Sequence, residues 1–262
     1  MADLAACAIV KNEGAYIYEW LSFHHVVGVE RFFIYDNNST DDTRAEIARW
    51  PLRDRVTVID WPHVPGQLAA YHHMLAHHRD AATWCAFIDC DEFLCPRGPI
   101  SVRDFLYEMS PLCDTLYVHW LMFGSSGQVA RTPGPVTERF LRRGHADFGP
   151  NLIGKSIARL ATGAVPSSPH VVRGPGRFVN EMNVALDAAA SAPGLRPSHR
   201  FIALNHYFTK SLEEWRQRRA LGMADHGPAF IRPEREFRHH DVNDVLDVTA
   251  ANIMQQARRL FY

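Results

Sequence analysis

The chain has 262 residues, which is long for one α/β domain and short for two, so we expect one domain over residues 1–262. Hydrophobic residues make up 47% and charged residues 22%, as in ordinary globular proteins. The formal net charge of -1 gives no global field that would favour nucleic acid or an anionic membrane as a partner.

The sequence lacks an apolar run of the ~18 residues that a membrane-spanning helix needs. Its 5 cysteines are odd in number, and four of them lie in or near apolar runs. A disulfide framework is therefore not expected, and a reducing, cytoplasmic location is favoured. We expect no transmembrane segment, although peripheral membrane contact stays open.

Strands and helices alternate in the first third of the chain. The predicted strands are Leu4–Val10, Arg31–Tyr35, Val56–Ile59 and Trp84–Ile88, and the predicted helices are Tyr16–Val27, Asp41–Trp50 and Gln67–His78. Ser39 or Thr40 can cap the second helix. The alternation predicts an α/β fold with a mostly parallel central sheet flanked by helices. Glycine-rich dinucleotide and P-loop fingerprints are absent from the sequence, which disfavours nicotinamide dehydrogenases and P-loop enzymes.

Carboxylates follow the fourth predicted strand directly, at Asp89, Asp91 and Glu92. In open α/β sheets, ligands bind at the carboxyl ends of strands. Oxygen ligands in this arrangement suit Mg²⁺ or Mn²⁺, with positions left for water or phosphate. A solvated acidic turn after a core strand is the alternative interpretation.

The second half of the chain is less regular. Residues 132–150 and 163–197 are rich in Gly, Pro, Ser and Ala, which predicts loops on the same domain. Ser211 and Glu214 have the spacing of a capping box, for a helix that runs to about Leu221 and ends at Gly222. An amphipathic helix is predicted over residues 241–260.

Several segments together resemble the GT-A-type glycosyltransferases, specifically the family 2 and family 92 groups. These segments are C-A-I-V-K-N-E from Cys7, E-W-L-S-F-H from Glu19, F-F-I-Y-D-N-N-S-T-D-D-T from Phe32, F-I-D-C-D-E-F from Phe87, W-L-M-F-G-S-S-G from Trp120, E-R-F from Glu138, G-K-S-I from Gly154 and N-H-Y-F-T-K-S-L-E-E-W from Asn205. The resemblance covers about residues 4–222.

The resemblance implies a GT-A, Rossmann-like fold and a metal-dependent, inverting hexosyltransferase. Such an enzyme moves a sugar from a nucleotide-diphosphate sugar, with a UDP-sugar favoured, to a saccharide or glycoconjugate acceptor. It further implies a nucleotide-sugar-binding half over about residues 1–125 and an acceptor-binding half over about residues 126–262.

The resemblance also assigns roles to individual residues. Lys11, Asn12, Glu13, Asp36 and Asn37 would hold the nucleoside, Gln67 would lie near the donor, and Asp89, Asp91 and His206 would hold Mn²⁺ or Mg²⁺ with the diphosphate. Apart from the resemblance, Lys155, Lys210 and Arg216 could each approach the diphosphate or be solvated. The catalytic base is expected among Glu138, Asp147 and Glu181, with Glu138 preferred because it belongs to the E-R-F segment.

Two other functions remain open on the sequence. A metal-dependent phosphohydrolase or phosphotransferase of the dehalogenase type also places D-x-D after a strand, but that group expects Thr or Val where Phe93 stands. A non-catalytic nucleotide-sugar-binding protein on the same fold is the other alternative.

Overall fold

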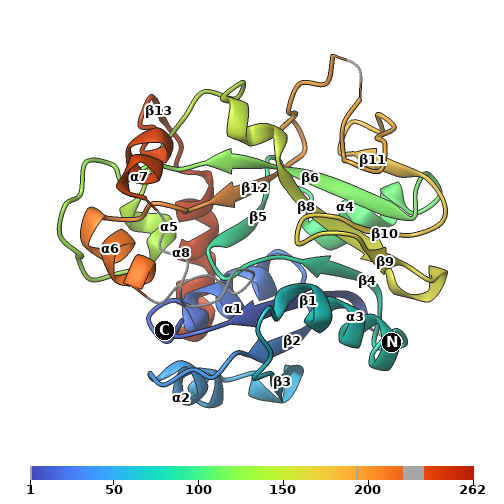
Figure 1. The fold of residues 1–262 in the computed structure, drawn as a ribbon, viewed down its shortest axis with the longest axis horizontal. Coiled ribbons are helices and arrows are strands. Elements are labelled where there is room, and N and C mark those ends of the chain that lie inside the picture. Colours follow the sequence, from blue (N-terminus) through green and yellow to red (C-terminus); the bar gives the residue numbers. More distant parts are fainter. Residues whose placement is uncertain (1, 193, 221–232) are drawn as a thin grey trace.

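The computed structural model describes residues 2–192, 194–220 and 233–262 (Figure 1). Its first half contains β1 (Ala2–Val10), α1 (Ile17–Val26), β2 (Arg31–Asp36), α2 (Thr43–Arg49), β3 (Val56–Asp60), α3 (Gln67–His77), β4 (Ala82–Phe87), β5 (Glu92–Pro96), α4 (Val102–Met109) and β6 (Thr115–Met122). The remainder contains α5 (Val136–Arg139), β7 (Arg142–Arg143), β8 (Gly154–Arg159), β9 (Val165–Pro166), β10 (Val172–Arg173), β11 (Phe178–Asn180), β12 (Ile202–His206), α6 (Leu212–Ala220), α7 (Glu234–His240), β13 (Val245–Leu246) and α8 (Thr249–Phe261). Short 3-10 helices cover Arg53–Arg55, Gly149–Leu152 and Leu160–Thr162.

A nine-stranded sheet forms the centre of the described chain, in the order β3-β2-β1-β4-β8-β6-β12-β5, with β11 paired to β6. The pairings among β3, β2, β1 and β4, and those of β6 with β11 and β12, are parallel. Strands β8 and β5 run antiparallel to their neighbours. The predicted α/β class with a mostly parallel sheet is confirmed.

Helices cover both faces of the β1 to β4 half of the sheet because successive side chains of a strand point to opposite faces. Leu4, Ala6 and Ala8 of β1 pack in one apolar cluster with α1, α4 and α8. Ala5, Cys7 and Ile9 pack in a second cluster with α3. All five cysteines are buried free thiols within these layers.

The alternating elements predicted for the first third of the chain are confirmed, with bounds that differ by a few residues. Gly28 ends α1 with a φ of 111°, a conformation that glycine adopts without steric cost. The predicted cap of α2 was wrong. The N-cap residue is Asp42, whose side chain makes no capping hydrogen bond. The Ser39 hydroxyl does not cap α2 but accepts a hydrogen bond from the Asn12 amide.

One prediction for the second half needs correction. The terminal helix α8 begins at Thr249 rather than at residue 241, since the preceding residues form β13 and its flanking turns. The capping box is confirmed, because Ser211 and Glu214 exchange side-chain to backbone hydrogen bonds at the start of α6. The predicted end of this helix at Leu221 and Gly222 lies outside the described residues.

Candidate active site

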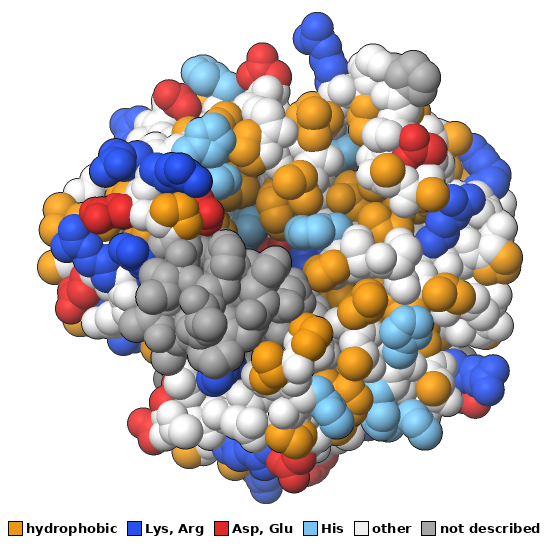
Figure 2. All heavy atoms as spheres, viewed as in Figure 1, with side chains coloured by type: hydrophobic (Ala, Val, Ile, Leu, Met, Phe, Trp, Pro, Cys, Tyr) orange, Lys and Arg blue, Asp and Glu red, His pale blue; other side chains and the backbone are white. Residues whose placement is uncertain are grey.

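A cavity of about 580 Å³ lies where the carboxyl ends of β1, β2, β4 and β12 meet. Figure 2 shows hydrophobic and histidine side chains around a hollow near the middle of this face. Most residues with an assigned role line it: Lys11, Asn12, Glu13, Asn37, Gln67, Asp89, Asp91, Lys155 and His206. Segments far apart in the sequence thus meet at one place, which is typical of a ligand site in an open α/β sheet.

Asparagine side chains fix the loops after β1 and β2 by hydrogen bonds to the backbone. The Asn12 side-chain oxygen accepts a hydrogen bond from the Thr40 amide at 2.7 Å, and Asn12 itself has a φ of 56°. The Asn37 side chain donates to the carbonyl oxygens of Trp61 and His63 at 2.7 and 2.9 Å. Asn37 faces the cavity, whereas Asp36 is buried behind it.

Asp36 stabilises the loop after β2. It accepts hydrogen bonds from the Ser39 amide and from the Arg44 guanidinium. Burial raises the pKa of the Asp36 carboxyl, but these hydrogen bonds outweigh burial and lower it. Asp36 therefore braces the loop that presents Asn37, and it does not line the cavity.

Asp89 pairs with a buried lysine. Its two carboxylate oxygens accept hydrogen bonds from Gln67 at 2.7 Å and from the Lys155 ammonium at 2.9 Å. Lys155 also donates to the Pro169 carbonyl oxygen at 2.9 Å, and its side chain is 1% exposed. Burial alone would lower the pKa of Lys155, but Asp89 and Glu92 hold it well above its usual value. Lys155 is thus a fixed cation at the base of the cavity.

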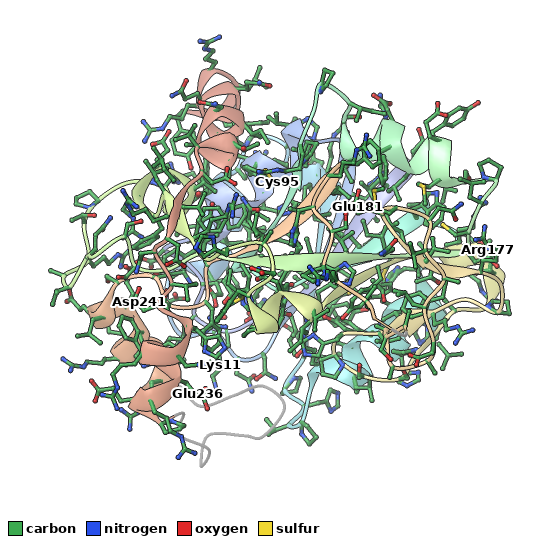
Figure 3. The ribbon with its side chains drawn as sticks, turned by 90° about the horizontal axis from the view of Figure 1, so that it is seen from above. Lys11, Cys95, Arg177, Glu181, Glu236 and Asp241 are labelled. Carbon is green, nitrogen blue, oxygen red and sulfur yellow. The ribbon has the colours of Figure 1, made fainter. Side chains whose placement is uncertain are left out.

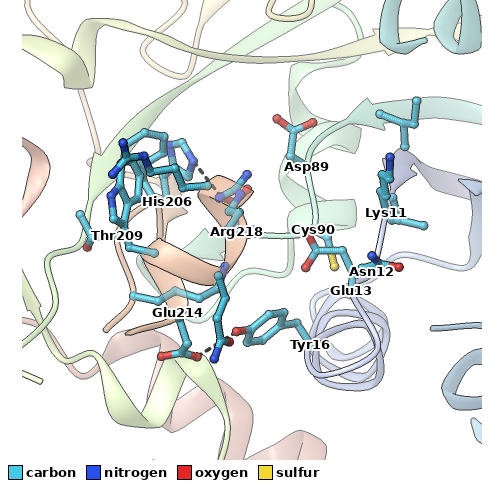
Figure 4. A pocket seen from close by; sticks show the side chains of 18 of the residues that line it. Lys11, Asn12, Glu13, Tyr16, Asp89, Cys90, His206, Thr209, Glu214 and Arg218 are labelled. Atoms are coloured by element: carbon cyan, nitrogen blue, oxygen red, sulfur yellow. Dashed lines mark hydrogen bonds and ion pairs between the residues drawn. The ribbon is translucent and has the colours of Figure 1, made fainter. Parts of the chain in front are cut away.

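Asp91 carries a second ion pair. It contacts the Arg218 guanidinium of α6 and lies 3.3 Å from Nε2 of His206 at the end of β12. Burial raises the pKa of the Asp91 carboxyl, but Arg218 and His206 hold it well below its usual range. Figure 4 shows the Asp89 carboxylate turned away from Arg218 and His206. The two aspartates therefore point to different partners.

Glu92 connects the loop that carries Asp89 and Asp91, here called the acidic loop, to β6. It is fully buried, and its carboxylate accepts hydrogen bonds from the Asp89 amide at 2.8 Å and from Trp120 Nε1 at 2.7 Å. The Glu92 carbonyl oxygen also accepts from Trp20 Nε1 at 3.0 Å. Glu92 therefore positions the loop rather than facing the cavity.

Asp89, Asp91 and His206 were predicted to hold a divalent metal, and oxygen ligands with one imidazole suit Mn²⁺ or Mg²⁺. In the part of the chain that the structure describes, however, no group of three or more His, Cys, Asp or Glu residues is placed to hold an ion. Both aspartates have basic side chains as partners instead. The three residues therefore do not form a closed metal site on their own, and further ligands of an ion would have to come from a bound molecule.

The preferred catalytic base does not lie at the cavity. Glu138 on α5 forms an ion pair with Arg258 of α8 at 2.8 Å, and it is not among the cavity-lining residues. Its short helix presents it to the C-terminal helix. Asp147 is exposed and also absent from the lining.

Glu181 is buried in a structural role. It accepts hydrogen bonds from the backbone amides of Arg200 and Phe201 at 3.0 and 2.9 Å, which fixes the chain before β12. Figure 3 shows it away from Lys11 and Glu236, which both line the cavity.

Sequence reasoning missed a polar cluster at the cavity rim. Glu214 of α6 accepts two hydrogen bonds from Arg139, at 2.7 and 3.0 Å. It also accepts one from the Tyr16 hydroxyl at 2.9 Å, and Figure 4 labels Glu214 and Tyr16 at the cavity. Arg218, the partner of Asp91, follows Glu214 by one helical turn. That spacing was the available signal, because residues four apart share a helix face.

The E-W-L-S-F-H segment of α1 is structural. Buried Glu19 accepts hydrogen bonds from the amides of Val136 and Thr137 at 2.6 and 2.9 Å, which caps α5. His24 contacts the Trp20 carbonyl oxygen at 2.8 Å through Nδ1 and accepts from the Leu94 amide at 3.2 Å through Nε2. This segment therefore ties α1 to α5 and β5.

The described residues include no helix long and apolar enough to cross a membrane.

Solved structures show partial likeness at low identity. Staphylococcus aureus TarS, residues 1–349 in complex with UDP, is 16% identical, with a TM-score of 0.42 over 61% of this chain and 47% of that chain. Glucosyl-3-phosphoglycerate synthase from Mycobacterium tuberculosis, in complex with Mn²⁺, UDP-glucose and phosphoglyceric acid, is 19% identical, with a TM-score of 0.35 over 61% of this chain and 57% of that chain.

Sequence comparison shows similarity to one family over part of the chain. A glycosyltransferase family 92 protein of Oryza sativa subsp. japonica is 34% identical over 144 residues, which are 54% of this chain and 25% of that protein. One from Arabidopsis thaliana is 35% identical over 92 residues, 35% of this chain and 16% of its own length. The chain thus spans a quarter or less of these relatives. The family model described as glycosyltransferase family 92 matches residues 5–127, so the predicted resemblance to family 92 is confirmed over that region.

Proposed function

We propose that the cavity binds a nucleotide-diphosphate sugar, a UDP-sugar first among them, and transfers its sugar to a saccharide or glycoconjugate acceptor. The observation that carries this proposal is the meeting of the family-matched loops after β1 and β4 with Lys155 and His206 at one cavity. A cavity of about 580 Å³ is within the roughly 300–1,000 Å³ range of small-ligand sites.

In this proposal the nucleoside lies over Lys11, Asn12, Glu13 and Asn37, and the diphosphate lies beside Lys155. The ordered loops and the buried ammonium would orient the donor before reaction, which lowers the barrier by positioning and by fixed charge. Residues after about 125 would contact the acceptor.

Asp89, Asp91 and His206 are the residues that would hold Mn²⁺ or Mg²⁺, which neutralises the diphosphate when bound. The described cavity-lining residues include as many acidic as basic side chains. The acidic ones are Glu13, Asp41, Asp89, Asp91, Glu214 and Glu236, and the basic ones are Lys11, Arg131, Lys155, Lys210, Arg218 and Arg219. A diphosphate would therefore add uncompensated negative charge, which favours a divalent cation that arrives with it.

We further propose that transfer inverts the anomeric configuration, because the acceptor would attack opposite the diphosphate. Since Glu138 is paired with Arg258, the group that takes the acceptor proton is sought among the carboxylates and histidines that line the cavity.

A panel of nucleotide sugars tests the proposal by thermal shift, with and without Mn²⁺. A donor at 100 times its Kd should stabilise the protein by about 2.7 kcal/mol. The donor that shifts the melting temperature is then incubated with saccharides, and proton NMR of the product reports the anomeric configuration. The double variant Asp89→Asn/Asp91→Asn should lose the shift, whereas Asp147→Asn, on the exposed surface, should keep it.

Two outcomes would replace the proposal. Release of phosphate from small esters, with no response to nucleotide sugars, would favour the phosphohydrolase or phosphotransferase alternative. A specific donor shift with neither transfer nor slow donor hydrolysis would favour a binding protein.

A further inference from the structure

Aromatic side chains form one wall of the cavity beyond the acidic loop. The wall consists of Trp120, His170, His206, Phe208, Trp215 and His240. The ring centroids of Trp120 and His206 are 4.4 Å apart, and those of Phe208 and His240 are 4.7 Å apart. Phe208 and Trp215 are 5.0 Å apart. Because each ring packs on the next, we refer to these six residues as the aromatic wall.

Trp120 is held in a fixed orientation within the aromatic wall. Its Nε1 donates to the buried carboxylate of Glu92 at 2.7 Å, and its carbonyl oxygen contacts His199 Nε2 at 2.6 Å. The residue is nevertheless only half-buried and lines the cavity. A tryptophan whose polar atom is already bonded presents mainly apolar ring surface to a ligand.

Two buried nitrogen atoms of the aromatic wall have no hydrogen-bond partner among the described residues. They are Nδ1 of His206, on a side chain 6% exposed, and Nε1 of Trp215, on a residue 2% exposed. Burial of such groups without partners costs free energy. An indole N–H can only donate, and His206 Nδ1 is an acceptor when Nε2 donates to Asp91. A hydroxyl group can serve either atom.

The order of the sheet separates this wall from the nucleotide loops. Asn12 and Asn37 follow β1 and β2, whereas Trp120 and His206 lie on β6 and β12. Strands β4 and β8, which carry the acidic loop and Lys155, lie between the two groups. A ligand that extends from the nucleotide loops past Asp89 therefore reaches the aromatic wall with the part beyond its phosphates.

We propose that the aromatic wall is a subsite for a pyranose ring, with Trp120 as its stacking platform. A pyranose has a face of carbon-bound hydrogens that packs on an aromatic ring, and hydroxyl groups at its edge that can accept a hydrogen bond from Trp215 Nε1. This inference rests on the proposed function. The ring comes from one of two sources, the transferred sugar of the donor or the acceptor saccharide.

Calorimetry on Trp120→Ala, with UDP and with the UDP-sugar selected by the panel, tests the donor source. Saturation-transfer NMR with methyl glucosides, galactosides and N-acetylglucosaminides, in the presence of UDP and Mn²⁺, tests the acceptor source. The control is Tyr107→Ala, which removes an aromatic side chain that is 78% exposed on α4, outside the cavity. Because truncation of Trp120 could unfold the chain, Trp120→Phe and Trp120→Leu are compared as well.

Relative to Trp120→Phe, which also lacks the hydrogen bond to Glu92, Trp120→Ala should keep its affinity for UDP and lose about tenfold or more in affinity for one sugar-bearing ligand. A loss confined to the UDP-sugar assigns the subsite to the donor, and a loss confined to the glycoside assigns it to the acceptor. Trp120→Phe should bind better than Trp120→Leu, since it keeps an aromatic face. Equal binding by these two variants and wild type, or an equal loss for UDP and UDP-sugar, would overturn the subsite. Failure of wild type to bind any UDP-sugar, with glycoside binding intact and dependent on Trp120, would overturn only the proposed donor.

Discussion

At the scale of single residues, the position of Glu92 requires a side chain with two hydrogen-bond acceptors. Both groups that face its carboxylate are donors, the Asp89 amide and Trp120 Nε1. A glutamine offers one acceptor and one donor, so one of these N–H groups would face another N–H group. We expect Glu92→Gln to lower the free energy of unfolding by roughly 1–3 kcal/mol, because a buried donor is left unsatisfied.

Urea unfolding measures this change, and the UDP titration of the same variant shows whether the loop geometry depends on it. Glu108→Gln, an exposed carboxylate on α4, is the control for the loss of one charge. Unchanged stability and unchanged UDP affinity in Glu92→Gln would show that Glu92 does not position the loop.

Individual residues also show which features of the site the sequence could predict. Asp89, Asp91 and His206, which were predicted to share a metal site, line one cavity because each follows or ends a strand whose carboxyl end faces it, and their role stays a prediction. Sequence could not show that Arg218 contacts Asp91 or that Glu138 contacts Arg258. Both pairs join side chains from segments distant in the chain, so their contacts depend on tertiary packing.

At the scale of elements, Glu214 joins three helices. Its carboxylate accepts hydrogen bonds from Ser211 at the start of α6, two from Arg139 of α5, and one from Tyr16 before α1. Burial raises the pKa of Glu214, but the hydrogen bonds from Arg139 and Ser211 outweigh it and hold the pKa at about 2. This value lies below the ordinary pKa of 4.5, so the stabilisation is present above pH 4.5 and is lost as the pH falls toward 2.

We therefore expect Glu214→Gln to be less stable than wild type at pH 7 by roughly 2–3 kcal/mol. The difference should shrink as the pH is lowered from 5 to 2.5. Urea unfolding at several pH values measures it, with Glu213→Gln as the control because Glu213 is its exposed neighbour. A difference that stays constant over this pH range would mean that the charge of Glu214 does not stabilise the helix junction.

The hydrophobic pattern of the sequence predicted some of the strands and missed others. Strands β1, β2 and β4 are apolar runs that end at polar turns, which is the local signature of a buried parallel strand. Strand β8 carries Lys155 in its buried part, and β5 begins with the buried Glu92. Charged residues in such positions look solvent-exposed in sequence, so these strands were not predicted.

At the scale of the whole molecule, the antiparallel strand β8 lies between the two groups of parallel strands in the sheet. This insertion brings Lys155 to Asp89 from the opposite chain direction. The loops after β1 and β2 and the aromatic wall are therefore separated by a pair of charges, Asp89 and Lys155, that sequence patterns in either half alone do not reveal.

The same arrangement leads to an expectation for metal binding in the free protein. Asp89 and Asp91 are already neutralised by Lys155 and Arg218, and they point to different partners. Two carboxylates also leave most coordination positions of Mn²⁺ to other ligands. We expect Mn²⁺ to bind weakly to the protein alone and at least about tenfold more tightly once UDP supplies phosphate oxygens, by thermodynamic coupling between the two ligands.

Calorimetric titration of Mn²⁺ with and without UDP measures this coupling, and titration of UDP with and without Mn²⁺ must give the same factor because linkage is reciprocal. Asp89→Ala/Asp91→Ala should abolish the coupling, whereas Asp147→Asn should leave it intact because Asp147 lies outside the cavity lining. Mn²⁺ binding of equal strength in the double variant would remove both aspartates from the metal site. Tight Mn²⁺ binding without UDP would instead require Arg218 to leave Asp91 in the free protein, which would contradict the ion pair that holds α6 against the acidic loop.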